Sequence, residues 1–307
     1  MHLPPAPEVP SDQHGRAPVH LRYEDVSQDG RVLLEALPNG VGEAMWRDAM
    51  ARHPMTAAFL ERGLAAILTR YVLEGGEGPF PVDGPFEAEG SFELAHGVDA
   101  KGEVERIYLN MWVDITAPLG RTNLAPPPRA GERALAGRMF AEHVFTRLFA
   151  PPEERRVLRL DVPGMPALPT KRYDALPVRR ILELPEGARP LEPSFALDPL
   201  PIVFGPRHTD SNQHVNSLVY MTLFEEAAVR RFEALGKGAM WLGRGLEVGY
   251  RKPCFAGQRV RLALRAYEDG ERLGAVGGFY AEADAASPEA LARAQPHAYV
   301  KMAFARA

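Results

Sequence analysis

The chain has little of several features that would place it in a specialised class. Its 307 residues include one cysteine, Cys254, which excludes an internal disulfide and favours a reducing cytoplasm. No run approaches the roughly 20 consecutive apolar residues of a membrane span, and the start of the chain lacks the cationic and apolar segments of a secretory signal. Lys and Arg number 36 against 40 Asp and Glu, so nothing predicts a nucleic-acid surface. We therefore expect a cytoplasmic protein without membrane or nucleic-acid partners.

The whole chain is 46% hydrophobic, and its length of 307 residues favours two domains over one. The first domain is predicted over residues 19–150. The first 18 residues hold five prolines and are expected to be a disordered tail. The expected elements are a hairpin of strands at 19–26 and 31–37, a helix at 56–73, and strands at 85–94, 103–115 and 134–149. The composition of 134–149 also suits a helix, and strand is favoured.

The second half repeats this plan after a proline-rich linker at residues 151–195. A helix is expected at 218–235, because apolar residues recur at three and four and Gly236 follows as a C-cap. Strands are expected at 244–252, 258–268, 272–284 and 297–305, which gives a second domain over 196–307. One long apolar helix needs a large apolar surface, and a curved antiparallel sheet wrapped round it supplies one. The predicted class is α+β.

The run HTDSNQHVNSLVY at residues 208–220 carries the strongest chemical signal. A carboxylate, an amide and an imidazole, at Asp210, Asn212 and His214, share the parity of one extended face. The same residue types are common in loops and helix N-caps, and Asn216 or Ser217 is a natural cap for the following helix. The pattern alone leaves both interpretations open.

This run, followed by Tyr220 and Glu226, resembles the signature of hot-dog-fold thioesterases. It is most similar to the acyl-acyl-carrier-protein thioesterases, whose motif is Asp-x-Asn-x-His-Val-Asn-Asn, and it shares the Asp210 position with the 4-hydroxybenzoyl-CoA thioesterase group. The resemblance implies a tandem (double) hot-dog fold, in which each repeat is a curved antiparallel sheet around one long central helix. It also implies a catalytically degenerate first repeat, with the motif in the second.

The resemblance and the chemistry of thioester hydrolysis together suggest roles for the motif. Asp210 is the candidate base or nucleophile, and His214 is an alternative base because its ordinary pKa lies near neutrality. Asn212 would hold water or polarise the carbonyl. The unpaired backbone amides of a helix start suit an oxyanion, which predicts donors at Val215, Asn216 and Ser217.

The chain departs from the family pattern at two positions. Ser217 stands where the family has a second Asn, and Pro253-Cys254 stands where the plant enzymes have a Glu-Cys pair. A second acid would have to come from the helix, at Glu225 or Glu226, or from the other repeat. The candidate substrate-binding residues are Tyr220, Glu226, Arg251, Lys252 and Cys254.

Each of these candidates also has a structural interpretation. Tyr220 lies on the apolar side of the helix and fits the core, and Cys254 fits a small apolar side chain in the core. Arg251 and Lys252 fit exposed cations at a strand end, or cations that meet the phosphates of CoA or phosphopantetheine. In the first repeat the residues that could line an acyl pocket, or simply pack in the core, are Trp46, Met50 and Met55.

The predicted function is hydrolysis of an acyl-CoA or acyl-carrier-protein thioester, within fatty acid or polyketide metabolism. No cofactor is expected, and no metal, because His208, Asp210 and His214 lack the spacing of known helical metal sites. A monomer with an internal hot-dog pair and a homodimer both fit. The alternatives are a non-catalytic acyl-thioester binding protein, a hot-dog dehydratase or hydratase, and an acyltransferase.

Overall fold

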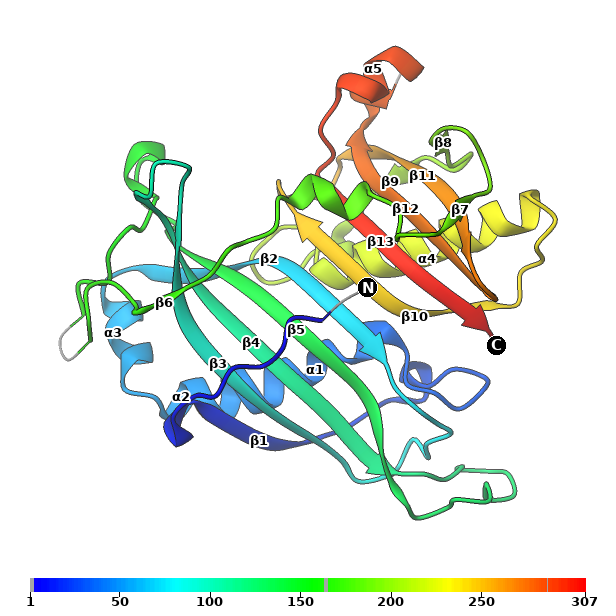
Figure 1. Ribbon diagram of the computed structural model, residues 1–307, viewed down its shortest axis with the longest axis horizontal. Helices are drawn as coiled ribbons and strands as arrows, with labels where there is room; N and C mark the ends of the chain where they lie inside the picture. The colour runs from blue at the N-terminus through cyan, green and yellow to red at the C-terminus, as the bar shows by residue number, and fades with distance from the viewer. Residues whose placement is uncertain (1–2, 163–164, 286) are drawn as a thin grey trace. The chain divides into compact units, whose positions relative to one another are not determined.

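The chain divides into two compact units, one ending at Leu176 and the other beginning at Pro177 (Figure 1). The computed structural model describes residues 3–162, 165–285 and 287–307. The boundary falls inside the segment predicted as a linker, so residues 151–176 belong to the first unit and residues 177–195 to the second. Among the described residues, no helix is both long and apolar enough to cross a membrane.

The first unit is built on an antiparallel sheet of five strands in the order β1-β3-β4-β5-β2. A short sixth strand, β6, pairs with β3 in parallel. The strand bounds are β1 (His14–Val19), β2 (Leu64–Gly75), β3 (Phe86–Val98), β4 (Val104–Pro118), β5 (Arg133–Arg147) and β6 (Lys171–Arg172). The strands predicted from residues 85–94, 103–115 and 134–149 are therefore confirmed as β3, β4 and β5.

A helical segment packs on this sheet, earlier in the chain than predicted. It consists of α1 (Pro38–Gly40), the π-helix η4 (Val41–Ala49) and α2 (Met50–Arg52), and η4 contacts β1, β3 and β4. A separate short helix, α3 (Met55–Glu61), follows. The helix predicted at 56–73 was wrong beyond Glu61, because residues 64–75 form β2.

A β-bulge explains that error. The register of β2 against β5 shifts between Leu68 and Arg70, which leaves Thr69 as an extra residue. A bulge changes the parity of the side chains that follow it. Leu64 and Leu68 before the bulge therefore share a face with Tyr71 after it, and this spacing of four and three is that of a helix.

The start of the chain is more ordered than predicted. Residues 14–19, which begin within the predicted tail, form β1 and pair with β3 at the sheet edge. Gly15 permits this, because a Cβ there would lie 2.0 Å from the carbonyl oxygen of Ala44 on the helix. The hairpin of strands predicted within residues 19–37 was wrong. This segment contains the 3-10 turns η2 (Tyr23–Asp25) and η3 (Leu34–Ala36), and between them Val26 and Val32 form one isolated antiparallel bridge.

His143 on β5 is a titratable group inside the core of the first unit. Its side chain is packed edge to face against Trp46, with 5.4 Å between ring centroids, and its Nδ1 lies 3.2 Å from the Leu109 carbonyl oxygen. Burial lowers its pKa from 6.5 to about 4. The imidazole is therefore neutral in the folded protein at pH 5 to 6, where an unfolded chain would protonate it.

We expect this histidine to make the protein less stable in mild acid. The unfolded state binds the proton more readily, so stability present above pH 6.5 falls as the pH approaches 4, by up to roughly 3 kcal/mol. Urea unfolding between pH 7 and 4 measures this loss, and His143→Gln should flatten it. The exposed-site control His20→Asn should keep the wild-type slope. A His143→Gln slope equal to that of the control would contradict the expectation.

The second unit has one long helix against an antiparallel sheet in the order β10-β13-β12-β11 (Figure 1). The bounds are α4 (Ser217–Ala234), β10 (Trp241–Tyr250), β11 (Arg259–Asp269), β12 (Arg272–Ala281), α5 (Pro288–Arg293) and β13 (Ala298–Arg306). The predicted helix and four strands are confirmed. The helix buries Phe224, Ala228 and Phe232, and Phe232 packs against Phe304 at 5.0 Å.

The helix and a 3-10 turn cover opposite faces of this sheet. Tyr250 at the end of β10 contacts Tyr220 of α4, with 5.7 Å between ring centroids. The preceding residue, Gly249, faces Val178 of the turn η6 (Val178–Leu182). Side chains alternate along a strand, so α4 and η6 lie on different faces.

The proline-rich segment of the second unit covers the free edge of β11. Three two-residue strands pair with β11: β7 (Arg189–Pro190), β8 (Ala196–Leu197) and β9 (Ile202–Val203). The segment also buries two carboxylates, Glu192 and Asp198, which pair with Arg231 and Arg230 of α4. The segment therefore belongs to the fold of the second unit.

Candidate functional site

The motif forms a small hairpin that leads into α4. Thr209 and Val215 form an isolated antiparallel bridge, and the amide of Asp210 donates to the carbonyl of His214 at 3.1 Å. The turn closes through the Gln213 amide, which donates to the Asp210 carbonyl at 3.0 Å. Gln213 has a φ of 66°, the conformation that lets the chain reverse within so few residues. The hairpin brings positions 210 and 214 opposite each other.

The Asp210 carboxylate and the His214 ring lie on the same side of this hairpin. Oδ1 of Asp210 is 3.8 Å from Nδ1 of His214, and the two side chains are 25% and 42% exposed. The same Oδ1 accepts a hydrogen bond of 2.8 Å from the backbone amide of Asn212. Both ionisable groups can therefore meet a solvent-borne substrate.

Asn212 is placed differently from the other two. It is exposed at the tip of the turn, and its side-chain amide has no hydrogen-bond partner among residues 3–162, 165–285 and 287–307. Asn212 contributes to the hairpin through its backbone amide, which donates to Asp210. The hairpin thus joins two of the three predicted side chains.

The three backbone amides predicted as oxyanion donors are not equivalent. The Val215 amide donates to the carbonyl of Cys254 at 2.7 Å, and the Asn216 amide donates to the carbonyl of His208 at 2.9 Å. Neither is available to a ligand. The Ser217 amide donates to no other residue in the described part of the chain, so it is the one donor of the three that remains.

The start of α4 is held from two sides. The Asn216 side chain caps the helix by accepting from the Leu218 amide at 2.9 Å. The Tyr250 hydroxyl donates to the Ser217 carbonyl at 3.0 Å, which ties the end of β10 to the first turn. These contacts fix the first turn of the helix, which carries the Ser217 amide.

Tyr220 and Cys254 are buried next to the hairpin, where the Cys254 carbonyl accepts from the Val215 amide. Tyr220 is 3% exposed and packs against Phe279 at 5.1 Å, while the Cys254 side chain is fully buried. Burial raises the pKa of the Cys254 thiol, and the hydrogen bond from the Tyr220 hydroxyl offsets this only in part. A buried, protonated thiol is a poor nucleophile.

The remaining charged candidates differ in what they contact. The Arg251 guanidinium donates to the carbonyls of Pro296 and Gln295 at 2.8 and 2.9 Å, and Lys252 is exposed. Glu226 is exposed and lies 3.8 Å from Arg230 on the same helix. A Glu225 carboxylate oxygen accepts from the Gly243 amide at 2.8 Å, over two turns from the helix start.

In the first unit, Met50 and Met55 are each 2% exposed and belong to the core, whereas Trp46 is 37% exposed. The helix there begins with Pro38 and has no side-chain cap. Across the described residues, no group of three His, Cys, Asp or Glu side chains is placed to hold a metal ion.

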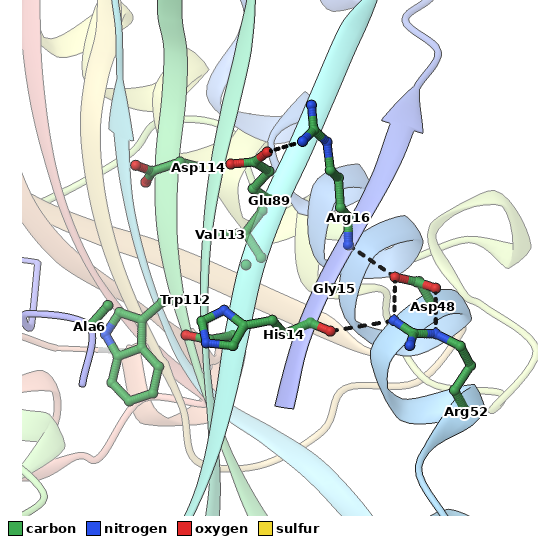
Figure 2. A pocket seen from close by; sticks show the side chains of 12 residues that line it. Ala6, His14, Gly15, Arg16, Asp48, Arg52, Glu89, Trp112, Val113 and Asp114 are labelled. Atoms are coloured by element: carbon green, nitrogen blue, oxygen red, sulfur yellow. Dashed lines mark hydrogen bonds and ion pairs between the residues drawn. The ribbon is translucent and has the colours of Figure 1, made fainter. Parts of the chain in front are cut away.

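A cleft of about 510 Å³ in the first unit was not predicted (Figure 2). Its charges are already paired: Arg16 with Glu87 and Glu89, and Arg52 with Asp48. The Arg16 amide also donates to Asp48 at 3.0 Å. Paired, solvent-exposed charges give this cleft no evident chemistry.

Two residues of the motif region, Tyr250 and His208, were given no role in thioester chemistry from the sequence. Tyr250 ends a strand some 30 residues away, so only tertiary structure could connect it with Ser217. His208 begins the motif itself, and its ring Nδ1 accepts from the Gly205 amide at 3.1 Å.

Comparison with known proteins rests on structure alone. No family model and no curated protein sequence matches the chain. A protein from Lactobacillus plantarum assigned as an oleoyl thioesterase has a TM-score of 0.56 at 13% identity, covering 95% of this chain and 96% of its own. The chain shares the fold of that thioesterase. The resemblance inferred from the motif is thus confirmed at the level of the hot-dog fold.

Two further solved structures give the same result. An acyl-ACP thioesterase from Bacteroides thetaiotaomicron has a TM-score of 0.55 at 14% identity, covering 96% of this chain and 98% of its own. The 12:0-ACP thioesterase of Umbellularia californica has a TM-score of 0.55 at 13% identity, covering 96% of this chain and 95% of its own. Both matches extend over both units.

Proposed function

We propose that this protein is a thioesterase that hydrolyses an acyl-CoA or acyl-carrier-protein thioester at the hairpin of the second unit. The observation that carries the proposal is the partly exposed Asp210 carboxylate, 3.8 Å from the His214 ring and next to a helix start whose Ser217 amide is unused within the described residues. A base, a second titratable group and an oxyanion donor are what thioester hydrolysis needs. The shared fold supports this assignment.

In the proposed reaction, Asp210 removes a proton from water and the resulting hydroxide attacks the thioester carbonyl. The Ser217 amide donates to the oxyanion that develops there, with the positive end of the helix dipole behind it. When the intermediate collapses, the C–S bond breaks and the thiolate takes a proton from the protonated Asp210 or from His214. Direct attack by Asp210, with a mixed anhydride that water then hydrolyses, uses the same donors.

His214 could act as the base in place of Asp210. Its ring is the more exposed of the two, and Asp210 at 3.8 Å would stabilise the imidazolium that forms. Asn212 would then orient the attacking water.

We propose that each unit is one hot-dog repeat, and that the first is catalytically silent. The helix of the first repeat lacks a motif like that of residues 208–216. Of the three residues predicted to line an acyl pocket there, Trp46 is the most exposed and would contact the acyl chain. Lys252, which forms no ion pair with any residue described, and Arg251 would meet the phosphate of the thiol carrier.

A thiol-release assay on acyl-CoA and acyl-carrier-protein substrates tests the proposal. We expect free thiol and free acid in equal amounts, and an enzyme-only blank corrects for Cys254. Stable acyl-CoA binding without release over hours would instead indicate a binding protein. A change in enoyl absorbance without thiol would indicate a dehydratase or hydratase, and thiol release with the acyl group on another acceptor would indicate a transferase.

A further inference from the structure

His208 is held by its backbone and its ring beside the start of α4. Its carbonyl accepts from the Asn216 amide at 2.9 Å, so it lies alongside the residue that caps the helix. Its ring packs edge to face against Phe204, with 5.9 Å between centroids, and Phe204 packs against Tyr220 at 5.9 Å. The ring therefore has a fixed place next to the first turn of α4.

The backbone also fixes the tautomer of this ring. The Gly205 amide donates to Nδ1 at 3.1 Å, so Nδ1 must carry a lone pair. A neutral imidazole with an unprotonated Nδ1 carries its proton on Nε2. The ring thus presents one N–H donor at Nε2, which forms no hydrogen bond with any of the described residues.

We propose that His208 is a catalytic hydrogen-bond donor of the thioester site, acting through Nε2–H on the same carbonyl oxygen as the Ser217 amide. This rests on the proposed function, because the ligand is the thioester carbonyl. His208 keeps its proton throughout: it stabilises charge that develops on oxygen, and the bonds made and broken are those already described. The developing oxyanion would then accept hydrogen bonds from the Ser217 amide and from the His208 ring, instead of from the amide alone.

The alternative role for His208 is purely structural, as an acceptor that closes the turn after Gly205. Two substitutions separate the roles. The side-chain oxygen introduced by His208→Asn can replace Nδ1 as acceptor for the Gly205 amide but supplies no donor at the Nε2 position. The longer amide of His208→Gln can place an N–H near the Nε2 position but cannot accept from Gly205 in the same way.

The test measures kcat and KM for thiol release, together with affinity for a 2-oxoalkyl-CoA in which a methylene separates sulfur from the carbonyl. We expect His208→Asn to unfold like the wild type, to lose about 100-fold in kcat with little change in KM, and to bind the ketone about 3- to 10-fold more weakly. His208→Gln should recover at least part of the lost kcat. The exposed control His20→Asn should match the wild type in both measurements.

A His208→Asn variant with the wild-type kcat and ketone affinity would overturn the role of His208 and leave the thioesterase proposal standing. A wild-type protein that releases no thiol, but binds the ketone more tightly than His208→Asn does, would overturn hydrolysis and keep His208 as a carbonyl donor. Absence of both turnover and ketone binding would overturn both proposals.

Discussion

Asp210→Asn is expected to lower kcat for thiol release by about 10²- to 10⁴-fold, the range attributed to a general base. The substitution removes the charge and basicity of the side chain but keeps an oxygen at Oδ1. That oxygen can still accept from the Asn212 amide, which lies 2.8 Å away, so the turn should survive. The loss would then report on chemistry, with little change in stability. Thiol-release assays on purified protein measure it directly.

A matched control exists in the first unit. Oδ1 of Asp99 accepts from the Lys101 amide at 2.8 Å, which is the same local turn remote in sequence from the motif. Asp99→Asn should therefore leave the rate unchanged. If Asp210→Asn were as active as Asp99→Asn, Asp210 would be a turn residue and not a base. His214 would then be the remaining candidate base.

Arg231→Met is expected to lower the free energy of unfolding by about 3–5 kcal/mol, the cost of leaving one buried charge without its partner. The Glu192 side chain is 6% exposed and accepts from Arg231 Nε at 3.2 Å and from the Ala266 amide at 2.9 Å. Without Arg231, a carboxylate would remain in the interior with one amide to stabilise it. Urea denaturation monitored by circular dichroism gives the difference.

Two further variants define the origin of that effect. Glu226→Gln removes an exposed partner 3.8 Å from Arg230 on the same helix, so its effect should stay below about 1 kcal/mol. Combining Glu192→Gln with Arg231→Met removes both charges and should restore much of the stability. Equal losses in Arg231→Met and the double variant would show that packing of the arginine stem, and not an unpaired charge, is responsible.

The second unit was well predicted because its signals are local. The helix from Ser217 has an Asn cap, a regular apolar stripe and a glycine after its last turn. In the first unit, the bulge at Thr69 converts strand alternation into helical spacing. A single sequence cannot distinguish a bulged strand from a helix by this spacing, because the extra residue of a bulge is recognised only from the pairing with the neighbouring strand.

The residues of the candidate site were proposed from the sequence, whereas its geometry was not. The positions of Asp210 and His214 follow from the short hairpin that the sequence itself specifies. The hydrogen bond from the Val215 amide to the Cys254 carbonyl could not be predicted, because Cys254 lies far along the chain in the loop after β10. Availability of backbone donors is a tertiary property that residue types do not encode.

The way β7, β8 and β9 lie along β11 has a consequence for dissecting the protein. Prolines at positions 190, 193, 199 and 201 divide this edge into short pieces, so it offers no continuous template for another strand. A fragment beginning at residue 196 would lose Glu192 and part of that cover, and would expose an edge prone to self-association. A fragment of the second unit that keeps this cover and the motif begins at Pro177.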